Sequence, residues 1–300
     1  MENPYLDPAR VRAALRSLDL RPARDMGQNF LTDASALGTI VAAAELTPHD
    51  TVIEVGPGLG VLTWELLQHA GRVVAVELDR RLAERLRQEF APEPRLTVVQ
   101  SDILKLPPGD LVKDEGEVFH PSSFILHPYK VVANLPYAIT SAALRHFLEA
   151  ENKPTTMVVL VQWEVAERIV ARLGDMSVLA HSVQIYAEPE IVARVPASSF
   201  VPAPAVDSAV LRLQLRPHPA TDVEVAPLMR LIKAGFLQAR KKLANALPTG
   251  LASLGTQVEK QRAVAALTAA GVDPNRRAET LTLEEWARVY RALFNDQDPE

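Results

Sequence analysis

Cysteine is absent from the 300-residue sequence, and its absence excludes disulfide bonds, thiolate nucleophiles and cysteine-ligated zinc sites. No apolar run approaches the roughly 18 residues of a membrane span, and the N-terminus lacks the basic and apolar stretches of a signal peptide. The seven histidines are scattered, with none three or four residues from another, so we expect no metal site. These absences predict a cytoplasmic protein that uses no metal and no membrane.

Charge is unevenly distributed along the chain, although the net charge is only −5. Residues 50–119 hold 13 Asp and Glu against 8 Lys and Arg. The opposite excess occurs at residues 8–24, with five Arg against one Asp, and at 235–277, with seven Lys and Arg against two acids. Basic segments of this kind are either solvated faces or surfaces for nucleic-acid phosphates, and charge alone leaves both interpretations open.

Strand-like and helical stretches alternate through the first 173 residues. The predicted strands are 51–55, 72–77, 96–100, 130–133 and 157–161. The predicted helices are 8–18, 34–46, 61–69, 80–90, 140–149 and 164–173, with a loop at 107–128. This alternation indicates an α/β fold, with a Rossmann-like parallel sheet that is covered on both faces.

The pattern changes in the last part of the chain. Extended runs at 182–194 and 206–215 predict a closing pair of strands. Helices are then predicted at 225–247, 258–270 and 283–294. We therefore expect two domains, a Rossmann-like domain over 1–216 and a smaller all-α domain over 217–300.

A glycine-rich turn, G-P-G-L-G at 56–60, follows the first strand of the predicted sheet. Glycines at such a turn let a ligand approach the backbone closely. A dinucleotide fingerprint would place its third glycine at position 61, where the sequence has Val61, and no Lys-Ser/Thr pair follows as in a P-loop. The turn therefore predicts a ligand without a pyrophosphate.

Two acids, Glu77 and Asp102, stand where the second and third strands end. Glu77 can accept hydrogen bonds from a ribose diol, and Asp102 can accept from the exocyclic amine of an adenine. Either acid alone is more often an exposed loop residue, but ligands of such sheets bind at the carboxyl edge that both acids share with the glycine turn. A ribose, an adenine and no phosphate together indicate S-adenosylmethionine.

The segment Asn134-Leu135-Pro136-Tyr137 follows the fourth strand, at the same predicted edge. The Asn134 side-chain oxygen and the Leu135 carbonyl can both accept from an exocyclic amino group, which would turn its nitrogen lone pair toward a methyl donor. Pro136 fixes the backbone, and Tyr137 offers a ring on which a base can stack. The alternative is a plain turn followed by a core tyrosine, and this segment alone leaves it open.

Together these motifs resemble the ribosomal RNA adenine-N6 dimethyltransferases of the KsgA type. The resemblance covers residues 25–294, in the order of that family, and implies a Rossmann-like S-adenosylmethionine-dependent methyltransferase domain with a smaller C-terminal all-α domain. The matching segments are GQNFL at 27–31, VIEVGPGLGVLT at 52–63, VELD at 76–79, Asp102, NLPY at 134–137, QWEVAE at 162–167, FVPAPAVDS at 200–208 and RKKLAN at 240–245.

The resemblance implies a role for each matching residue. The cofactor S-adenosylmethionine would be bound by Asn29, Leu31, Gly56, Gly58, Glu77, Asp102 and Asn134. The target adenine would be held by Asn134, Leu135, Pro136 and Tyr137, and by Phe200, which would stack on the base unless it is a core residue. Given an RNA substrate, the two basic segments lead to a further hypothesis, that RNA phosphates are contacted by Arg240, Lys241 and Lys242, and near the N-terminus by Arg10, Arg12, Arg16, Arg21 and Arg24.

The implied reaction is the N6,N6-dimethylation of two adjacent adenosines near the 3′ end of 16S rRNA, in a 30S pre-subunit, by a monomeric enzyme linked to small-subunit biogenesis. Two alternatives stay open: a 23S rRNA adenine-N6 methylase of the erythromycin-resistance type, and a ribosome-assembly factor that acts mainly by binding. Leu135 argues against the first, because that family usually has Ile at this place. The stretch 172–177 looks shorter, and 107–128 longer, than the family pattern.

Overall fold

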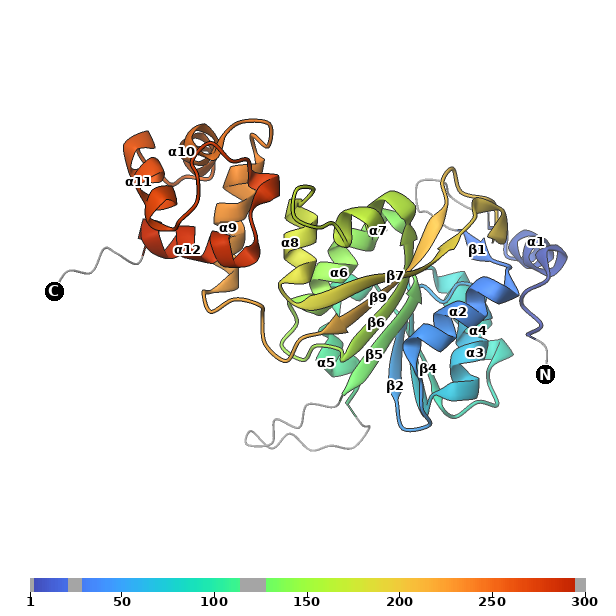
Figure 1. The fold of residues 1–300 in the computed structure, drawn as a ribbon. Helices are drawn as coiled ribbons and strands as arrows, with labels where there is room; N and C mark the ends of the chain where they lie inside the picture. Colours follow the sequence, from blue (N-terminus) through green and yellow to red (C-terminus); the bar gives the residue numbers. More distant parts are fainter. Residues whose placement is uncertain (1–2, 21–28, 114–127, 295–300) are drawn as a thin grey trace. The chain divides into compact units, whose positions relative to one another are not determined.

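The computed structural model describes residues 3–20, 29–113 and 128–294. The chain divides into two compact units, of which the first comprises Met1–Ala166 and Pro189–Leu215, and the second Glu167–Glu188 and Arg216–Glu300 (Figure 1). The sequence analysis placed residues 167–188 in the first domain. They group with the second unit because Ile185 belongs to its apolar core. As a division of function, the boundary at residue 217 stays a prediction.

A seven-stranded sheet is the frame of the first unit. Strands β2, β3, β4, β5 and β6 run parallel, as the alternation of strands and helices predicted, and β9 pairs antiparallel with β6. Because β2 lies between β3 and β5, the carboxyl ends of these three strands are neighbours, which is where such sheets bind ligands. The order across the sheet is β4 (Leu96–Gln100), β3 (Arg72–Glu77), β2 (Thr51–Val55), β5 (Tyr129–Asn134), β6 (Thr156–Gln162), β9 (Ser208–Leu215) and β7 (Ala187–Val195).

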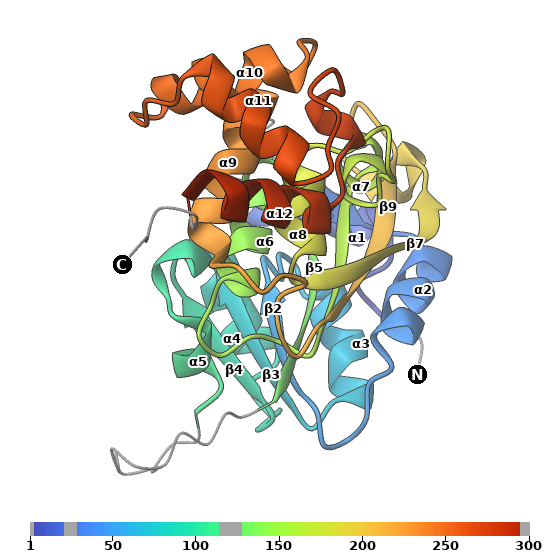
Figure 2. The ribbon, with the colours of Figure 1, turned by 60° about the vertical axis from the view of Figure 1, so that its left-hand side comes forward.

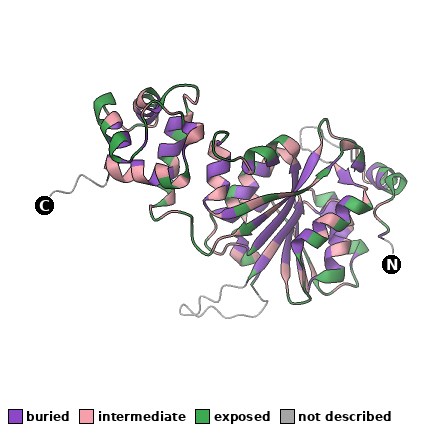
Figure 3. Ribbon diagram, in the orientation of Figure 1, coloured by how far each residue is buried: buried purple, intermediate pink, exposed green. Residues whose placement is uncertain are grey.

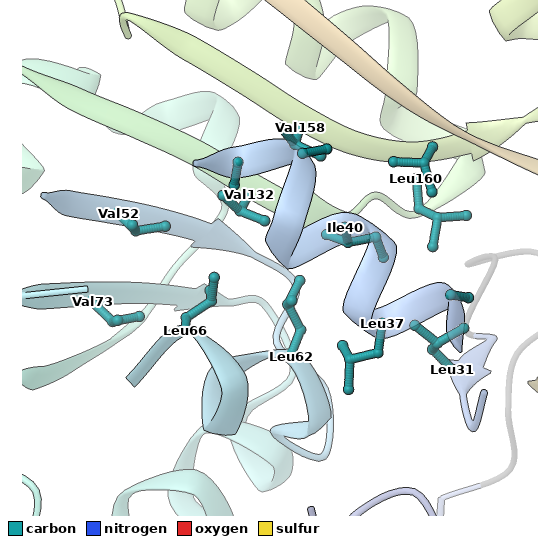
Figure 4. Packing of buried hydrophobic residues seen from close by; sticks show 14 of the residues in the cluster. Leu31, Leu37, Ile40, Val52, Leu62, Leu66, Val73, Val132, Val158 and Leu160 are labelled. Atoms are coloured by element: carbon teal, nitrogen blue, oxygen red, sulfur yellow. The ribbon is translucent and has the colours of Figure 1, made fainter. Parts of the chain in front are cut away.

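Helices cover both faces of this sheet, and Figure 2 shows α2 and α3 on one side and α6 on the other. Figure 4 shows Leu37 and Ile40 of α2 with Leu66 of α3 against valines of the strands. The central strands are buried along their length (Figure 3), which explains their continuous β-branched sequences. The helices are α1 (Pro8–Ser17), α2 (Ala34–Ala44), α3 (Val61–His69), α4 (Arg80–Glu89), α5 (Pro108–Leu111), α6 (Thr140–Leu148) and α7 (Trp163–Ile169).

A second, two-stranded sheet joins distant parts of the first unit. Strand β1 (Phe30–Leu31) pairs antiparallel with β8 (Phe200–Val201), so that Leu31 lies opposite Phe200. The Thr32 N–H continues this pairing and donates to the carbonyl of Ser199 at 2.8 Å. Two segments that the sequence analysis linked only through family resemblance are therefore adjacent.

The second unit contains the helices α8 (Val178–Gln184), α9 (Val225–Phe236), α10 (Leu243–Ser253), α11 (Lys260–Ala269) and α12 (Leu283–Phe294). The prediction of a single helix at 225–247 was wrong, because the chain reverses direction between α9 and α10. A Cβ on Gly250 of α10 would collide with the Ala234 carbonyl of α9, so the two helix backbones are in close contact. The turn between them contains residues 240–242.

Two further expectations need correction. The extended run predicted at 182–194 begins too early, because Ser177 caps α8 by accepting from the Ala180 N–H, and β7 starts at Ala187. The helix predicted to reach residue 173 ends at Ile169, where the Gln184 side chain donates to the Ile169 carbonyl. The predicted loop at 107–128 contains the short α5, and most of its remainder lies outside the described residues.

Candidate active site

The glycine turn after β2 contacts two other predicted parts of the site. Gly56 and Gly58 have φ angles of 67° and 60°, which residues with a Cβ rarely adopt. The Gly58 N–H donates to Oε2 of Glu77 at 3.1 Å, which ties the turn to the end of β3. A Cβ on Gly56 would lie 3.5 Å from Cδ of Pro136, so the turn also meets the segment after β5.

Glu77 ends β3 as a buried acid with 6% of its surface exposed. Its Oε2 accepts from Gly58, and its Oε1 accepts from the Asp79 N–H at 2.9 Å. Burial raises the pKa of Glu77, while the hydrogen bonds from these backbone N–H groups oppose the rise. Each carboxylate oxygen has more than one acceptor direction, so both can still accept from a ribose hydroxyl.

Asp102 lies beyond the end of β4, next to this edge. The register pairs Glu77 with Gln100, two residues before Asp102, and Oδ1 of Asp102 accepts from the Leu104 N–H at 3.0 Å. Leu78, which directly follows Glu77, is 59% exposed and offers an apolar surface beside the acid. Leu78 was part of the matching segment VELD but was given no role, because it continues the apolar pattern of the strand.

Asn134 ends β5 in the sheet position next to β2. Its Nδ2 donates to the main-chain carbonyl of Asn29 at 3.0 Å, which joins the predicted adenine-binding segment to the segment before β1. The side chain of Leu135 is buried, and its N–H donates to the Leu160 carbonyl at 3.3 Å. The main chain after Asn134 is therefore fixed by the neighbouring strand β6.

Tyr137 is half-buried and is held through its hydroxyl. The hydroxyl lies 2.7 Å from Oγ of Ser208, the fully buried first residue of β9. Burial raises the pKa of Tyr137, and the hydrogen bond with Ser208 opposes that rise. Ser208 was part of a matching segment but was given no role, and only its position in space indicates that it orients Tyr137.

Phe200 is placed in the apolar core rather than on the surface. It is 2% exposed and belongs to the same cluster as Leu31 and Leu37. Its strand partner Leu31 is a predicted site residue, so the structure does bring Phe200 to this part of the molecule. Stacking of Phe200 on a base stays a prediction, and it requires the ring to become accessible.

Glu54, within β2, is a second buried acid that the sequence analysis quoted without a role. It is 1% exposed, and Oε2 accepts from the Thr63 hydroxyl at 2.6 Å. Burial, with a smaller contribution from the charge of Glu77, raises the pKa of Glu54 to about 8. An acid inside a β-branched run was the signal that could have identified it.

The three predicted RNA-binding cations lie in the second unit, in the turn between α9 and α10. Arg240, Lys241 and Lys242 are all exposed, and Nζ of Lys242 donates to Oδ1 of Asn275 at 2.9 Å. In the first unit, Arg12 and Arg16 of α1 are also exposed. Arg21 and Arg24 lie outside the described residues.

The donors and acceptors at the sheet edge fit S-adenosylmethionine. The turn carries no side chain at Gly58, where a Cβ would lie only 3.0 Å from the Phe30 ring, and the two acids supply acceptors for ribose and adenine. A phosphate would be repelled by these carboxylates. The part of the chain that the structure describes contains no group of three or more His, Asp or Glu that could hold a metal ion.

Comparison with known proteins gives consistent similarities. The profile of the ribosomal RNA adenine dimethylase family matches residues 21–294. A ribosomal RNA small subunit methyltransferase A of Dehalococcoides mccartyi strain 195 is 47% identical over 280 residues, which cover 93% of this chain and 90% of the relative. The protein of the same name from Moorella thermoacetica is 43% identical over 294 residues, with 95% and 97% covered.

Solved structures extend this comparison to the fold. The 23S rRNA methyltransferase ErmE is 32% identical and superposes with a TM-score of 0.63, over 90% of this chain and 100% of its own. A dimethyladenosine transferase from Plasmodium falciparum is 24% identical and shares the fold, with a TM-score of 0.70 over 87% and 95% of the two chains. Within residues 3–20, 29–113 and 128–294, no helix combines the length and apolar composition that crossing a membrane requires.

Proposed function

Because the chain belongs to the ribosomal RNA adenine dimethylase family, we propose that it dimethylates N6 of two adjacent adenosines near the 3′ end of 16S rRNA, with S-adenosylmethionine as methyl donor. The observation that carries this proposal is the contact of the 134–137 segment with the glycine turn, beside the buried Glu77. Relatives named for the small subunit are 43% and 47% identical, against 32% for the 23S enzyme, which favours the small subunit.

Asn134 and Leu135 prepare the target amine. Oδ1 of Asn134 and the carbonyl of Leu135 each accept one amine N–H, so the nitrogen lone pair turns out of conjugation with the ring. Bringing the adenine out of its stack costs a few kcal/mol, and stacking on Tyr137 returns about 1–3 kcal/mol. The methylated nitrogen is acidic and loses its proton to water, so the site needs no strong base.

The remaining residues of the edge hold the methyl donor. S-adenosylmethionine, when bound, supplies a methyl group that its sulfonium charge has already activated. Glu77 accepts from the ribose hydroxyls and Asp102 from the adenine amine, while the backbone at Gly56 and Gly58 leaves room for the methionine portion. Asn29 and Leu31 close the site from the N-terminal side. Positioning of this kind replaces covalent or metal catalysis.

Exposed cations of both units bind the RNA backbone. Arg240, Lys241 and Lys242 are exposed together in one turn, and Arg12 and Arg16 are exposed on α1, so all five can meet phosphates. Their contribution is independent of base sequence. They position the RNA, and the 134–137 segment selects the adenine.

The partner is the 30S pre-subunit, which the protein meets as a monomer in the cytoplasm. A chain of 300 residues without cysteine suits a reducing compartment. These finer points rest on the proposed reaction.

Tritium transfer from labelled S-adenosylmethionine to undermethylated 30S particles, with 50S particles alongside, tests the proposal. We expect label in two adjacent adenosines of 16S rRNA and none in 50S. Removing one acceptor at a reacting centre costs about 100-fold or more, so Asn134→Ala should be at least this much slower. Label in 50S would support the 23S alternative, and full rescue of a deletion strain by Asn134→Ala would favour an assembly factor.

A further inference from the structure

The side-chain amide of Asn134 has a fixed orientation in the structure. Nδ2 donates to the Asn29 carbonyl at 3.0 Å, across 105 positions of the sequence. A carbonyl oxygen accepts hydrogen bonds and donates none, so it distinguishes the two ends of an amide that are otherwise alike in shape. With Nδ2 committed to Asn29, Oδ1 is left for another partner.

The Asn29 carbonyl is held in place by the residues that follow it. Leu31 is 1% exposed and pairs with Phe200 across the β1–β8 sheet. Beyond the strand, the Thr32 N–H donates to the Ser199 carbonyl at 2.8 Å, and the Ser199 hydroxyl donates to Oδ2 of Asp33 at 2.6 Å. Asn29 therefore directly precedes a paired strand, which limits how far its carbonyl can shift toward a different side chain at position 134.

We propose that the main-chain carbonyl of Asn29 is a positioning group, which orients the Asn134 amide so that Oδ1, and not Nδ2, meets the target amine. The inference rests on the proposed function and deepens it. An amine nitrogen with two N–H groups needs a hydrogen-bond acceptor. If Nδ2 stood in that place, two hydrogen-bond donors would face each other. Asn29 thus acts on the adenine side of the site as well as on the donor side.

The variant Asn134→Asp tests whether the side chain at position 134 must donate a hydrogen bond to the Asn29 carbonyl, in addition to accepting one from the target amine. Its ionised carboxylate accepts from an amine as well as an amide does, but it opposes the Asn29 carbonyl with a second acceptor. Its protonated form donates the O–H to Asn29 and accepts with the other oxygen, as asparagine does. The Asn134→Asp protein is therefore expected to work only in its protonated form.

The test is the ratio of kcat for Asn134→Asp to kcat for the wild-type protein, on undermethylated 30S particles between pH 5.5 and 8.5. We expect a loss of about 100-fold or more at pH 8, as for removal of an aligned catalytic partner, and a ratio that rises about tenfold for each pH unit lowered until the new carboxyl is protonated. The ratio cancels the other titratable groups of this edge, namely Glu54 on β2, Glu77 on β3, Asp33 and Tyr137.

A ratio that does not change with pH overturns the inference, at whatever level it stands, because no proton is then needed toward Asn29. Asn134→Ala is the matched control and should give a low, flat ratio. If the wild-type protein labels no rRNA, the proposed function fails instead, and the two failures are distinct.

If Asn134→Asp does not fold, as judged by circular dichroism, the wild-type protein still provides a test. With ¹⁵N-labelled asparagine, the Asn134 side-chain amide is assigned by its absence from Asn134→Ala. Its protons should exchange with water more slowly than those of the exposed Asn245. Equal exchange rates would overturn the inference.

Discussion

The two units of the molecule treat charge in opposite ways. In the first unit, Glu54 and Glu77 are 1% and 6% exposed, and burial raises the pKa of both. In the second unit, Arg240 and Lys241 are exposed on a turn. A buried acid responds to pH because its charged form is poorly solvated, whereas an exposed cation responds to salt because counterions screen it. The comparison teaches that the buried acids of the first unit and the basic turn of the second can be perturbed separately, the acids through protons and the turn through ions.

Glu54→Gln should give the largest effect, on the pH dependence of stability. The pKa of Glu54 rises from 4.5 to about 8 on folding, so the folded state keeps its proton while the unfolded state loses it. Stability therefore falls as pH rises through this window, by about 5 kcal/mol at most. Glutamine carries no such cost and still accepts from Thr63. Urea unfolding at pH 5 and pH 8 should show a fall for the wild-type protein that is clearly smaller in Glu54→Gln, where only the raised pKa of Glu77 still contributes.

Acids with lowered pKa values do not mask this effect. The pKa of Asp33, for example, is lowered chiefly by its hydrogen bond with Ser199, so its contribution is present above the unfolded pKa and is lost only as the solution becomes more acidic. Glu84→Gln, at an exposed acid of α4, is the matched control and should follow the wild-type curve. If stability depended on pH in the same way in Glu54→Gln and in the wild-type protein, the buried Glu54 would not be the cause of that dependence.

The second prediction contrasts how tightly helices pack in the two units. A Cβ on Gly250 would collide with the backbone of α9, so Gly250→Ala must push two helices apart and should destabilise the protein by about 3 kcal/mol. Gly38 lies in α2 with no atom within 4 Å of its Cβ position, and Gly38→Ala should stabilise by about 1 kcal/mol. Thermal unfolding of both variants checks the opposite signs. A neutral Gly250→Ala would mean that α9 and α10 separate without cost.

The same contrast explains which parts of the fold the sequence predicts. Strands β2, β3, β5 and β6 follow from β-branched runs because they are buried on both faces, and α3 occupies the predicted residues, Val61–His69. The edge strand β4 has no buried residue, and its apolar and β-branched residues alone predicted it. The break between α9 and α10 depends on contact between two backbones at Gly250, and no local pattern contains that information. The same distinction between local pattern and long-range contact applies to the residues of the candidate site. Glu77 follows from its place at a strand end, whereas the hydrogen bonds from Asn134 to Asn29 and between Tyr137 and Ser208 span 105 and 71 positions.

The third prediction concerns the exposed cations. Replacing Arg240, Lys241 and Lys242 together with glutamine should lower the slope of log K against log salt for 30S binding by about 2–3, since each phosphate contact contributes roughly 0.7–0.9. Filter binding at several salt concentrations measures the slope. Arg80→Gln is the control, because Arg80 is already paired with Glu84 at 2.7 Å. An unchanged slope in the triple variant would place the RNA elsewhere on the protein.

The smallest expected effect lies inside the first unit, at the hydrogen bond between Tyr137 and Ser208. Tyr137→Phe and Ser208→Ala should each cost about 1 kcal/mol in urea unfolding, and the double variant should cost less than their sum, because both changes remove one shared hydrogen bond.

Tyr129→Phe is the matched control, since that hydroxyl also donates within the first unit, to the Asn152 carbonyl at 2.9 Å, but outside the proposed site. We expect Tyr137→Phe, Ser208→Ala and Tyr129→Phe to destabilise the protein to a similar extent. A methyl-transfer assay then separates the first two variants from the control. Tyr137→Phe and Ser208→Ala should raise KM for 30S particles by the same factor, because either change frees the same ring, while Tyr129→Phe leaves KM unchanged. Strict additivity of the first two changes would mean that Ser208 does not orient Tyr137.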